Sequence, residues 1–585
     1  MGFWILEPSA GGHVPGTSFM GAGSKGPTGL TGSSADTYSS GDSLDPNLKY
    51  DTTGPAPIVL IPQPSDDPND PLNWSLRQRD CITAILCFVS VLASCLTSVL
   101  ASNTIILVVE FEHSLTETAL LTGYHLCSIG VTGIITVATA RVWGKRHLYV
   151  FGTVLLIVSS FWAGAAKDYN SLLWARILQG VAVCPFEALV NTSVGDLYCV
   201  HQRGKRMALT NFSLFGGAFI TPVVVGKITS TLGWRWSFYF VGIFSGLLLP
   251  LVILFVPETA FRRSSHYNSD IVASTSQIFS GSSSPTHPST NPDFPVDLVQ
   301  AREKDEHQEY APALRDGWVK RMALFNGRKS EDSLWKLVLR PIALLVHPAV
   351  FWGVVTQGAL IGWTVMIGVV LAFIFVGYPT LFTEVEVGYM YIGAFLGATA
   401  GFLLVGPVSD WSARWLTRRN NGIFEPEFRL FLIIPQALTG VLGLYLFGWT
   451  SANTLKYGWA LPDFFFGLEV MGTIIGAVAS SLYIVDAHRD IAVEAFTSLL
   501  LFKNFFSYAL TTKAFDWILE QGVWRTFWII GTVQVGVCLL TIPMYIFGKR
   551  NRALMQRYDI LKMTRLDCKV TKRGGSTFIE NVAAI

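Results

Sequence analysis

Two long apolar segments on either side of a short basic loop constrain this chain most strongly. Residues 174–198 and 207–228 are almost entirely apolar, and the sequence HQRGKR at 201–206 separates them. A helix that crosses a bilayer needs about 20 mostly apolar residues. Lys and Arg in short loops stay on the cytoplasmic side, so Arg203, Lys205 and Arg206 indicate a cytoplasmic loop. This stretch therefore predicts a membrane protein and its orientation.

The first of these segments carries charged residues that a lipid-facing helix would not tolerate. Arg176 and Glu187 are eleven residues apart, which is about three turns at roughly 3.6 residues per turn. Asn191 falls near the same helix face. A charge at the centre of a membrane costs roughly 2.5–3.5 kcal/mol and usually faces a protein interior or a water-filled path. We expect these residues to line such a path; alternatively, Arg176 lies near an interface or locks neighbouring helices.

The same alternation of apolar segments and basic loops continues along the chain. Half of the residues are hydrophobic, 14% are charged and the mean hydropathy is +0.42, which disfavours a soluble enzyme. The basic loops fall after every second segment, as expected for a cytoplasmic N-terminus. We predict an all-α polytopic fold with twelve transmembrane helices in two six-helix repeats. The expected spans are 80–105, 117–139, 147–166, 170–194, 206–228, 236–256, 348–375, 384–408, 428–448, 457–484, 491–515 and 524–547.

Three polar regions surround the two sets of spans. Residues 1–78 are rich in Gly, Ser, Pro and Asp, and we expect a disordered cytoplasmic tail. Residues 257–345 are expected to form a cytoplasmic linker with a short amphipathic helix near Trp318–Leu337. Residues 549–585 are expected to form a second cytoplasmic tail. The helical bundles are accordingly 79–256 and 346–548.

Several local motifs, taken with the 6+6 arrangement, resemble the major facilitator superfamily. ARVWGKRHLYVFG after the second span is similar to the family's loop signature, with Gly144, Lys145 and Arg146 retained, although Arg141 stands where an acid is usual. GPVSDWSAR in the second half keeps Gly406, Asp410 and Arg414. RILQG resembles a fourth-helix motif of proton-coupled members. The resemblance implies two repeats around a substrate site near the membrane midplane.

A narrower resemblance, which covers nearly the whole chain except the linker, is to fungal drug:proton antiporter-like proteins. It rests on the opening MGFWILEPSAGGHVPGT, on DPLNWS, on LGWRWSFYF at 232–240 and on EPEFRL at 425–430. One branch of that group resembles yeast permeases for histidinol and polyamines. The fifth span resembles a relaxed antiporter motif in which Thr221-Pro222 replaces the usual Gly-Pro. We expect a helix hinge at Gly217, Pro222 and Gly226.

The second half has intramembrane charges of its own. Glu469 and Lys503 each lie about twelve residues into antiparallel spans, which places them at similar depth at about 1.5 Å per residue. We expect the two to approach each other or to face the cavity in turn, either as a proton-coupling pair or as a static structural pair. We also expect Asp410 and Arg414 to join the eighth and ninth spans as an inner gate. The candidate substrate and proton pathway comprises Arg176, Glu187, Asn191, Asn211, Gln357, Glu469, Lys503 and Asn504, and the candidate gate comprises Lys145, Arg146, Gly406, Asp410 and Arg414.

These features predict a proton-coupled secondary transporter that exports a drug, toxin or secondary metabolite. Uptake of a cation such as a polyamine or histidinol is the alternative within the class, and a non-transporting receptor on the same scaffold is the alternative outside it. The sequence contains no GxxxxGK[ST] and no HExxH, so we expect neither ATP-driven export nor enzyme activity. We expect no cofactor or metal, no nucleic-acid partner, and a proton gradient as the energy source. The expected partners are a small-molecule substrate and a lipid bilayer. We expect a monomer in the plasma membrane, or in a vacuolar or other internal membrane.

Overall fold

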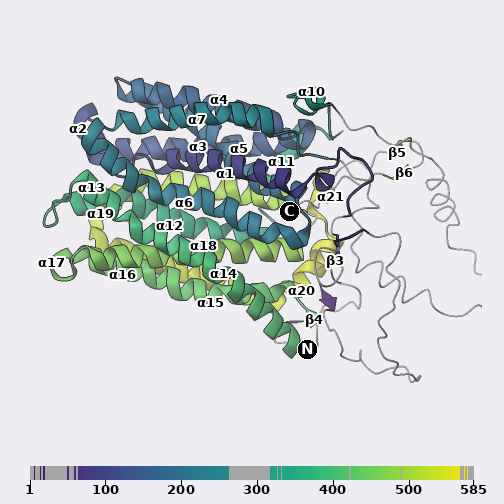
Figure 1. Ribbon diagram of the computed structural model, residues 1–585. Helices are drawn as coiled ribbons and strands as arrows, with labels where there is room; N and C mark the ends of the chain where they lie inside the picture. The colour runs from purple at the N-terminus through teal and green to yellow at the C-terminus, as the bar shows by residue number, and fades with distance from the viewer. Residues whose placement is uncertain are drawn as a thin grey trace, which may run out of the picture.

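Long helices that run roughly parallel dominate the structure (Figure 1). The computed structural model describes residues 63–261 and 317–566 apart from 326, 331, 421–422 and 489–490, together with a few positions before residue 61 and two short strands after residue 571. Helices α2, α13 and α17 lie at one end of the bundle, and α10, α20 and α21 lie at the other (Figure 1). The basic loops fall at the second end, which we call the inner end because positively charged loops remain cytoplasmic.

The first half of the chain forms six long helices and one short one. Apolar cores join these helices; Val89, Leu156 and Phe186, for example, are buried in one cluster. The helices are α1 (Leu76–Ser98), α2 (Thr104–Phe111), α3 (Leu115–Trp143), α4 (Arg146–Ala165), α5 (Tyr169–Leu197), α6 (Val200–Leu232) and α7 (Arg235–Phe255).

The second half repeats this plan after the linker. Its helices are α12 (Pro348–Val376), α13 (Glu384–Tyr389), α14 (Tyr391–Arg419), α15 (Ile433–Gln436), α16 (Leu442–Ala452), α17 (Thr454–Tyr457), α18 (Ala460–Ala487), α19 (Ala492–Leu539) and α20 (Thr541–Arg557). A 3-10 turn, Pro426–Leu432, and a π-helical turn, Ala437–Val441, complete the ninth span around α15 and α16.

The described residues contain eleven helical segments long and apolar enough to cross a membrane. The last of them, Ala492–Met563, is 72 residues long, which would be about 108 Å at 1.5 Å per residue and far exceeds a bilayer of about 30 Å. Gly522 has a non-helical φ of 79° and ψ of 160° inside it, where the chain turns back. Ten single spans and this double one give the twelve crossings expected from the sequence, which confirms the fold class.

Parts of the expected tails and linker have defined structure. Asp70 accepts hydrogen bonds from Ser65 N (3.0 Å) and Leu72 N (3.0 Å), so the tail is ordered before α1. The described part of the linker has two short helices, α10 (Trp318–Arg321) and α11 (Leu334–Leu344), in place of the one helix expected near Trp318–Leu337. The central part of the linker, 262–316, lies outside the described residues. α20 continues to Arg557, and α21 (Ile560–Met563) follows it.

A segment near the N-terminus docks on the inner end of the second half. β1 (Ser18–Phe19) pairs antiparallel with β4 (Ile423–Phe424). Thr17 Oγ1 donates to Glu425 Oε2 (2.7 Å), and Ile5 is buried against Phe428. Two other antiparallel pairs join β2 (Tyr50–Asp51) to β3 (Ile58–Val59) and β5 (Lys572–Arg573) to β6 (Ser576–Thr577). These positions are ordered, most of residues 1–62 lie outside the described residues, and disorder of the tail stays a prediction.

Candidate substrate cavity and proton site

A large cavity of about 1860 Å³ lies between the two halves. Helices of both halves line it, and its walls mix hydroxyl, amide and aromatic side chains. Residues that line its central part include Ser94, Thr122, Glu187, Asn191, Asn211, Phe215, Gln357, Thr364, Thr473, Ser481, Phe496, Lys503 and Asn504. Six of the eight candidate pathway residues are among them, namely Glu187, Asn191, Asn211, Gln357, Lys503 and Asn504.

The cavity opens toward the inner end and is closed at the outer end. At the inner end its lining includes Gly204 and Asp410, which are exposed, whereas Thr104 and Thr118 at the outer end are buried. The closure brings α6 and α13 together: a Cβ on Gly226 would lie 2.6 Å from the Glu384 carbonyl oxygen, and one on Gly388 would lie 2.5 Å from that of Pro222. No side chain fits there while the outer end is closed.

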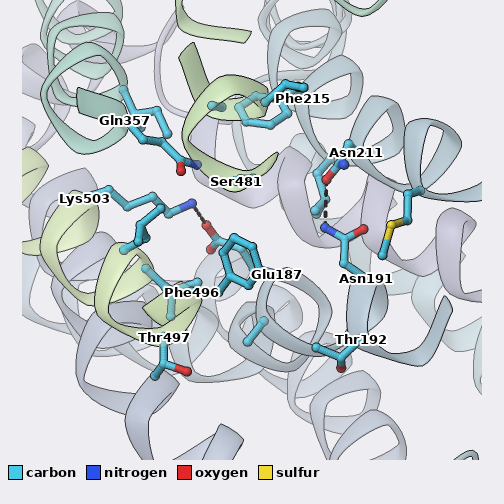
Figure 2. Close-up of a pocket in the computed structure, with 18 of the residues that line it drawn as sticks. Glu187, Asn191, Thr192, Asn211, Phe215, Gln357, Ser481, Phe496, Thr497 and Lys503 are labelled. Carbon is cyan, nitrogen blue, oxygen red and sulfur yellow. Dashed lines mark hydrogen bonds and ion pairs between the residues drawn. The ribbon is translucent and has the colours of Figure 1, made fainter. Parts of the chain in front are cut away.

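An ion pair crosses the centre of the cavity from one half to the other. Lys503 Nζ on α19 donates to Glu187 Oε1 on α5, and the two side chains are 17% and 18% exposed. Figure 2 shows Lys503 extended toward Glu187, with Gln357 and Ser481 beside it. The expectation that Lys503 approaches Glu469 is therefore wrong. Position along each span predicts a similar depth for those two residues, but it does not reveal that Lys503 faces a helix of the other half.

Amide side chains form a second polar group in the cavity, one helical turn from Glu187 along α5. Asn191 Nδ2 donates to Asn211 Oδ1 (2.8 Å), and Thr210 Oγ1 donates to Asn191 Oδ1 (2.6 Å). Figure 2 shows this amide pair away from the ion pair, on helices of the first half. Gln357 Oε1 accepts from Ser480 Oγ (3.2 Å), and Asn504 Nδ2 donates to Leu500 O (2.9 Å). Together these groups provide hydrogen-bonding partners around a cavity that also exposes aromatic rings.

Glu469 lies behind the cavity wall rather than in it. The carboxylate is 0% exposed and accepts hydrogen bonds from Thr364 Oγ1 (2.9 and 3.1 Å) and Thr473 Oγ1 (3.1 Å). Both threonines line the cavity. No Lys, Arg or His forms an ion pair with Glu469 in the part of the chain that the structure describes. Each of the two threonine hydroxyl groups thus lies between the carboxyl group and the cavity, and the carboxyl group has no counter-charge among the described residues.

Arg176 does not reach the cavity. It is 0% exposed, and its guanidinium donates to Leu96 O (2.6 Å), to Leu121 O (3.4 Å) and to Gln179 Oε1 (2.8 Å). These bonds tie α5 to α1 and α3, so the structure favours the helix-locking alternative over a place in the pathway. Arg176 and Glu187 have different surroundings because eleven residues at about 1.5 Å each place them roughly 16 Å apart along α5, although they lie near the same helix face.

The loop between α3 and α4 is held within the first half. Glu258 accepts from the backbone N–H groups of Lys145 (3.0 Å) and Arg146 (3.1 Å). Gly144 has a φ of 93°, and a Cβ there would lie 2.3 Å from Glu258 Oε2, so this position requires glycine. Lys145 Nζ also donates to Asp196 Oδ2 (2.6 Å) and Arg146 Nη2 to Ile253 O (2.8 Å).

The corresponding region of the second half is arranged differently from expectation. Arg414 Nε donates to the Asp410 carbonyl oxygen (3.1 Å), so it stays on its own helix, as residues four apart do. The side chain that joins the eighth and ninth spans is Arg429, whose Nη1 lies 3.9 Å from Asp410 Oδ1 and whose Nε donates to Asp486 Oδ2 (2.9 Å). The Asp410–Arg414 latch was therefore wrong. Gly406 lines the cavity with open space around its Cα.

A further inner contact between the halves was missed. Arg141 at the end of α3 donates to Glu494 at the start of α19, and Arg340 of α11 lies 3.6 Å from the same carboxylate. The signal in the sequence was Arg141 itself, because it stands at a motif position where an acid is usual. The partner could not be predicted, since Glu494 is 353 residues away.

Helix α6 remains helical through the expected hinge. Proline has no N–H and leaves the carbonyl four residues earlier without its helical donor. Here Ser98 Oγ of α1 donates to that carbonyl, Ala218 O (2.5 Å). Gly217 packs against α1, since a Cβ on it would lie 2.2 Å from Ser94 Oγ. The three hinge residues thus lie at close helix contacts, and bending at them stays a prediction.

The fold and cavity define a polytopic membrane transporter, with two helical halves around a central polar space. In the described residues no cluster of three or more His, Cys, Asp or Glu could hold a metal ion. The sequence profile of the Major Facilitator Superfamily matches residues 86–500. The chain belongs to this superfamily, which confirms the resemblance identified from its motifs.

Relatives of similar length support the same assignment. Protein HOL1 of Saccharomyces cerevisiae is 25% identical over 567 residues, covering 89% of this chain and 94% of that protein. The trichosetin biosynthesis cluster MFS transporter of Gibberella fujikuroi is 22% identical over 509 residues, covering 86% and 91%. Among solved structures, the proton:xylose symporter XylE of E. coli superposes with a TM-score of 0.52 at 15% identity, covering 81% of this chain and 96% of that one. The last similarity shows the fold alone.

Proposed function

We propose that this protein is a proton-coupled secondary transporter that exports a small organic molecule by alternating access. The observation that carries the proton coupling is Glu469, a fully buried carboxyl without a basic partner among the described residues, one hydroxyl group away from the cavity. Burying a charged carboxylate in a low-dielectric interior without a counter-charge is costly, and such a group takes up a proton instead. Glu469 therefore holds a proton in this arrangement and gives it up to the cavity during the transport cycle.

Alternating access is supported by the way the two halves touch. The outer end is closed by glycine contacts between α6 and α13, while the inner end is open. Two ion pairs join the halves, Glu187–Lys503 in the cavity and Arg141–Glu494 further in. Opening outward requires that the α6–α13 contact separate and that the inner ends close. Charged pairs that exchange partners can bias such a two-state equilibrium.

The cavity also indicates the kind of cargo. Its volume of about 1860 Å³ exceeds the roughly 300–1,000 Å³ of ordinary ligand pockets, so a molecule of drug size fits with water around it. Aromatic side chains such as Phe215 and Phe496 offer apolar contact beside the amide and hydroxyl groups. A relative whose name places it in a trichosetin biosynthesis cluster supports a secondary metabolite as cargo and export as the direction.

A panel of drugs and metabolites in cells with and without the protein tests this proposal. Export predicts lower accumulation of at least one compound in cells that contain it, with a larger difference at acidic external pH because the inward proton gradient is then steeper. Higher accumulation of a cation would instead establish uptake. No difference for any compound, with the tagged protein visible at the plasma membrane, would contradict transport and favour a receptor.

A further inference from the structure

Two threonine hydroxyl groups are the hydrogen-bond partners of the Glu469 carboxyl group in the described part of the chain. Thr364 Oγ1 of α12 lies 2.9 Å from Glu469 Oε1 and 3.1 Å from Oε2. Thr473 Oγ1, one turn along α18, lies 3.1 Å from Oε1 and 3.2 Å from Thr364 Oγ1. Thr364 Oγ1 also lies 3.0 Å from the carbonyl oxygen of Leu360. Thr364 alone is within reach of both carboxyl oxygens and of an acceptor outside the carboxyl group.

The hydrogens of this cluster can be counted, because each threonine hydroxyl has one hydrogen to donate and can also accept. When Glu469 is ionised, Thr364 and Thr473 both donate to it. When Glu469 is protonated, its O–H donates to Thr364 Oγ1, and Thr364 turns its own hydrogen to Leu360 O, 3.0 Å away. Every group is satisfied in both states without any movement of heavy atoms. Rotation of one hydroxyl is enough to change between them.

The position of Thr364 also connects Glu469 to water. Glu469 is absent from the cavity lining, whereas Thr364 is part of it and is 7% exposed. Thr473 lines the cavity too but is 2% exposed and contacts one carboxyl oxygen. A proton that leaves Glu469 for the cavity therefore has its shortest polar route through Thr364.

We propose that Thr364 is the proton relay between Glu469 and the cavity. The step is balanced: Thr364 first turns its hydroxyl hydrogen from Leu360 O to a cavity water. The Glu469 carboxyl then gives its proton to Thr364 Oγ as that hydroxyl hydrogen passes to the water, and Thr364 ends neutral beside an ionised carboxylate and a hydronium ion. The reverse sequence reprotonates Glu469. This inference rests on the proposed proton coupling and assigns to Thr364 a proton-transfer role that needs a hydroxyl group and not merely its size.

The test uses the full-length protein in nanodiscs and needs no substrate. Infrared spectroscopy follows the carboxyl C=O band that Glu469→Gln removes, first at equilibrium and then after a rapid upward pH jump. Thr364→Val keeps the side-chain shape but removes the hydroxyl, and Thr364→Ser keeps the hydroxyl. Thr356→Val is the matched control, because Thr356 is a buried threonine on the same helix that does not line the cavity.

We expect Thr364→Val to slow deprotonation of Glu469 about tenfold or more, by analogy with loss of a positioned proton-transfer group. We expect Thr364→Ser and Thr356→Val to remain within about threefold of the parent, a smaller change than loss of such a group gives. An unchanged rate in Thr364→Val, or equal slowing in Thr364→Ser, overturns the relay. Absence of any titrating Glu469 band between about pH 5 and 9, the range reached by buried carboxyl groups, overturns the proton coupling itself, so the two failures are distinguishable.

Discussion

Lys503 of the second half donates to the carboxylate of Glu187 in the first half, across the middle of the central cavity. Each side chain is mostly shielded from solvent, and each is the other's ion-pair partner. The pair therefore reports on how the halves face each other. Its geometry belongs to the inward-open arrangement, since the outer contacts are closed at the same time.

Removing one member of this pair should destabilise the inward-open arrangement. Glu187→Gln or Lys503→Met leaves a partly buried charge without its partner, which costs about 3–5 kcal/mol when burial is complete and less here. The exchanged double variant, Glu187→Lys with Lys503→Glu, should recover most of the lost thermal stability. The measurement is the unfolding midpoint of all four proteins in detergent. If the exchanged double variant is no more stable than the less stable of the two single variants, the pair does not stabilise this arrangement.

The outer closure makes a second prediction, about Gly226. Gly226→Ala places a Cβ 2.6 Å from a backbone carbonyl of α13, so the closed outer end becomes unfavourable and the population moves toward outward-open. An impermeant thiol reagent applied from outside should then label Ala101→Cys, which lines the outer part of the cavity, several-fold faster. Gly246→Ala is the control, because no neighbouring atom lies within 4 Å of the Cβ that alanine would add there. Equal labelling in the two backgrounds would show that Gly226 does not control the closure.

A third prediction concerns Arg552 at the inner end. This guanidinium is 1% exposed and donates to Glu425 Oε2 (2.8 Å) and Glu427 Oε2 (2.8 Å). Arg552→Met leaves the buried Glu427 carboxylate without its ion-pair partner and leaves Glu425 with Lys549 alone, at a cost of about 3–5 kcal/mol. The unfolding midpoint should fall markedly, and the docked N-terminal segment should become sensitive to protease.

Thr17→Val is the matched variant for that experiment. It removes the hydrogen bond to Glu425, worth about 1 kcal/mol, but keeps the ion pairs. Protease should then cut the segment faster while the unfolding midpoint changes little. A resistant segment in both variants would mean that the Arg552 cluster does not hold it in place.

A fourth prediction gives a pH dependence of stability. Burial lowers the pKa of His347 to about 4, against the opposing effect of Asp559. His488 packs edge-on against it, with ring centroids 4.4 Å apart, and burial also lowers the pKa of His488, with further contributions from His347 and Arg552. The folded protein thus binds fewer protons than the unfolded chain between about pH 6.5 and 4. Stability should therefore fall as the pH drops through that range.

The size of this effect for His347 is about 3 kcal/mol, from a difference of roughly 2.5 pKa units between the folded and unfolded states. The measurement is the unfolding midpoint between about pH 7 and pH 4, the window that these values define. His347→Gln should flatten the dependence, and His113→Gln, at a more exposed histidine, should not. A parent protein with a flat profile would contradict the account of this pair.

The sequence predicted the spans because an apolar run of membrane length has few alternatives. It also predicted which polar residues lie at membrane depth, since their position along a span gives depth directly. It did not predict partners: Lys503 pairs with Glu187 and not with Glu469, and Arg414 remains on its own helix. Partner choice depends on which face of each helix meets which neighbouring helix. The residues near each charge in the sequence do not determine how the helices pack against one another. Thr364 and Thr473 escaped notice because hydroxyl groups are common in membrane helices.

The most direct test of the account is transport by purified protein in liposomes, with and without an imposed pH gradient, for a compound identified in cells. The parent protein should move the compound against its concentration gradient when the pH gradient is imposed. Glu469→Gln, which keeps the hydrogen-bonding shape but cannot release a proton, should bind the compound and exchange it at equilibrium without accumulating it. Gradient-driven accumulation by Glu469→Gln equal to that of the parent would contradict the central claim that Glu469 carries the coupled proton.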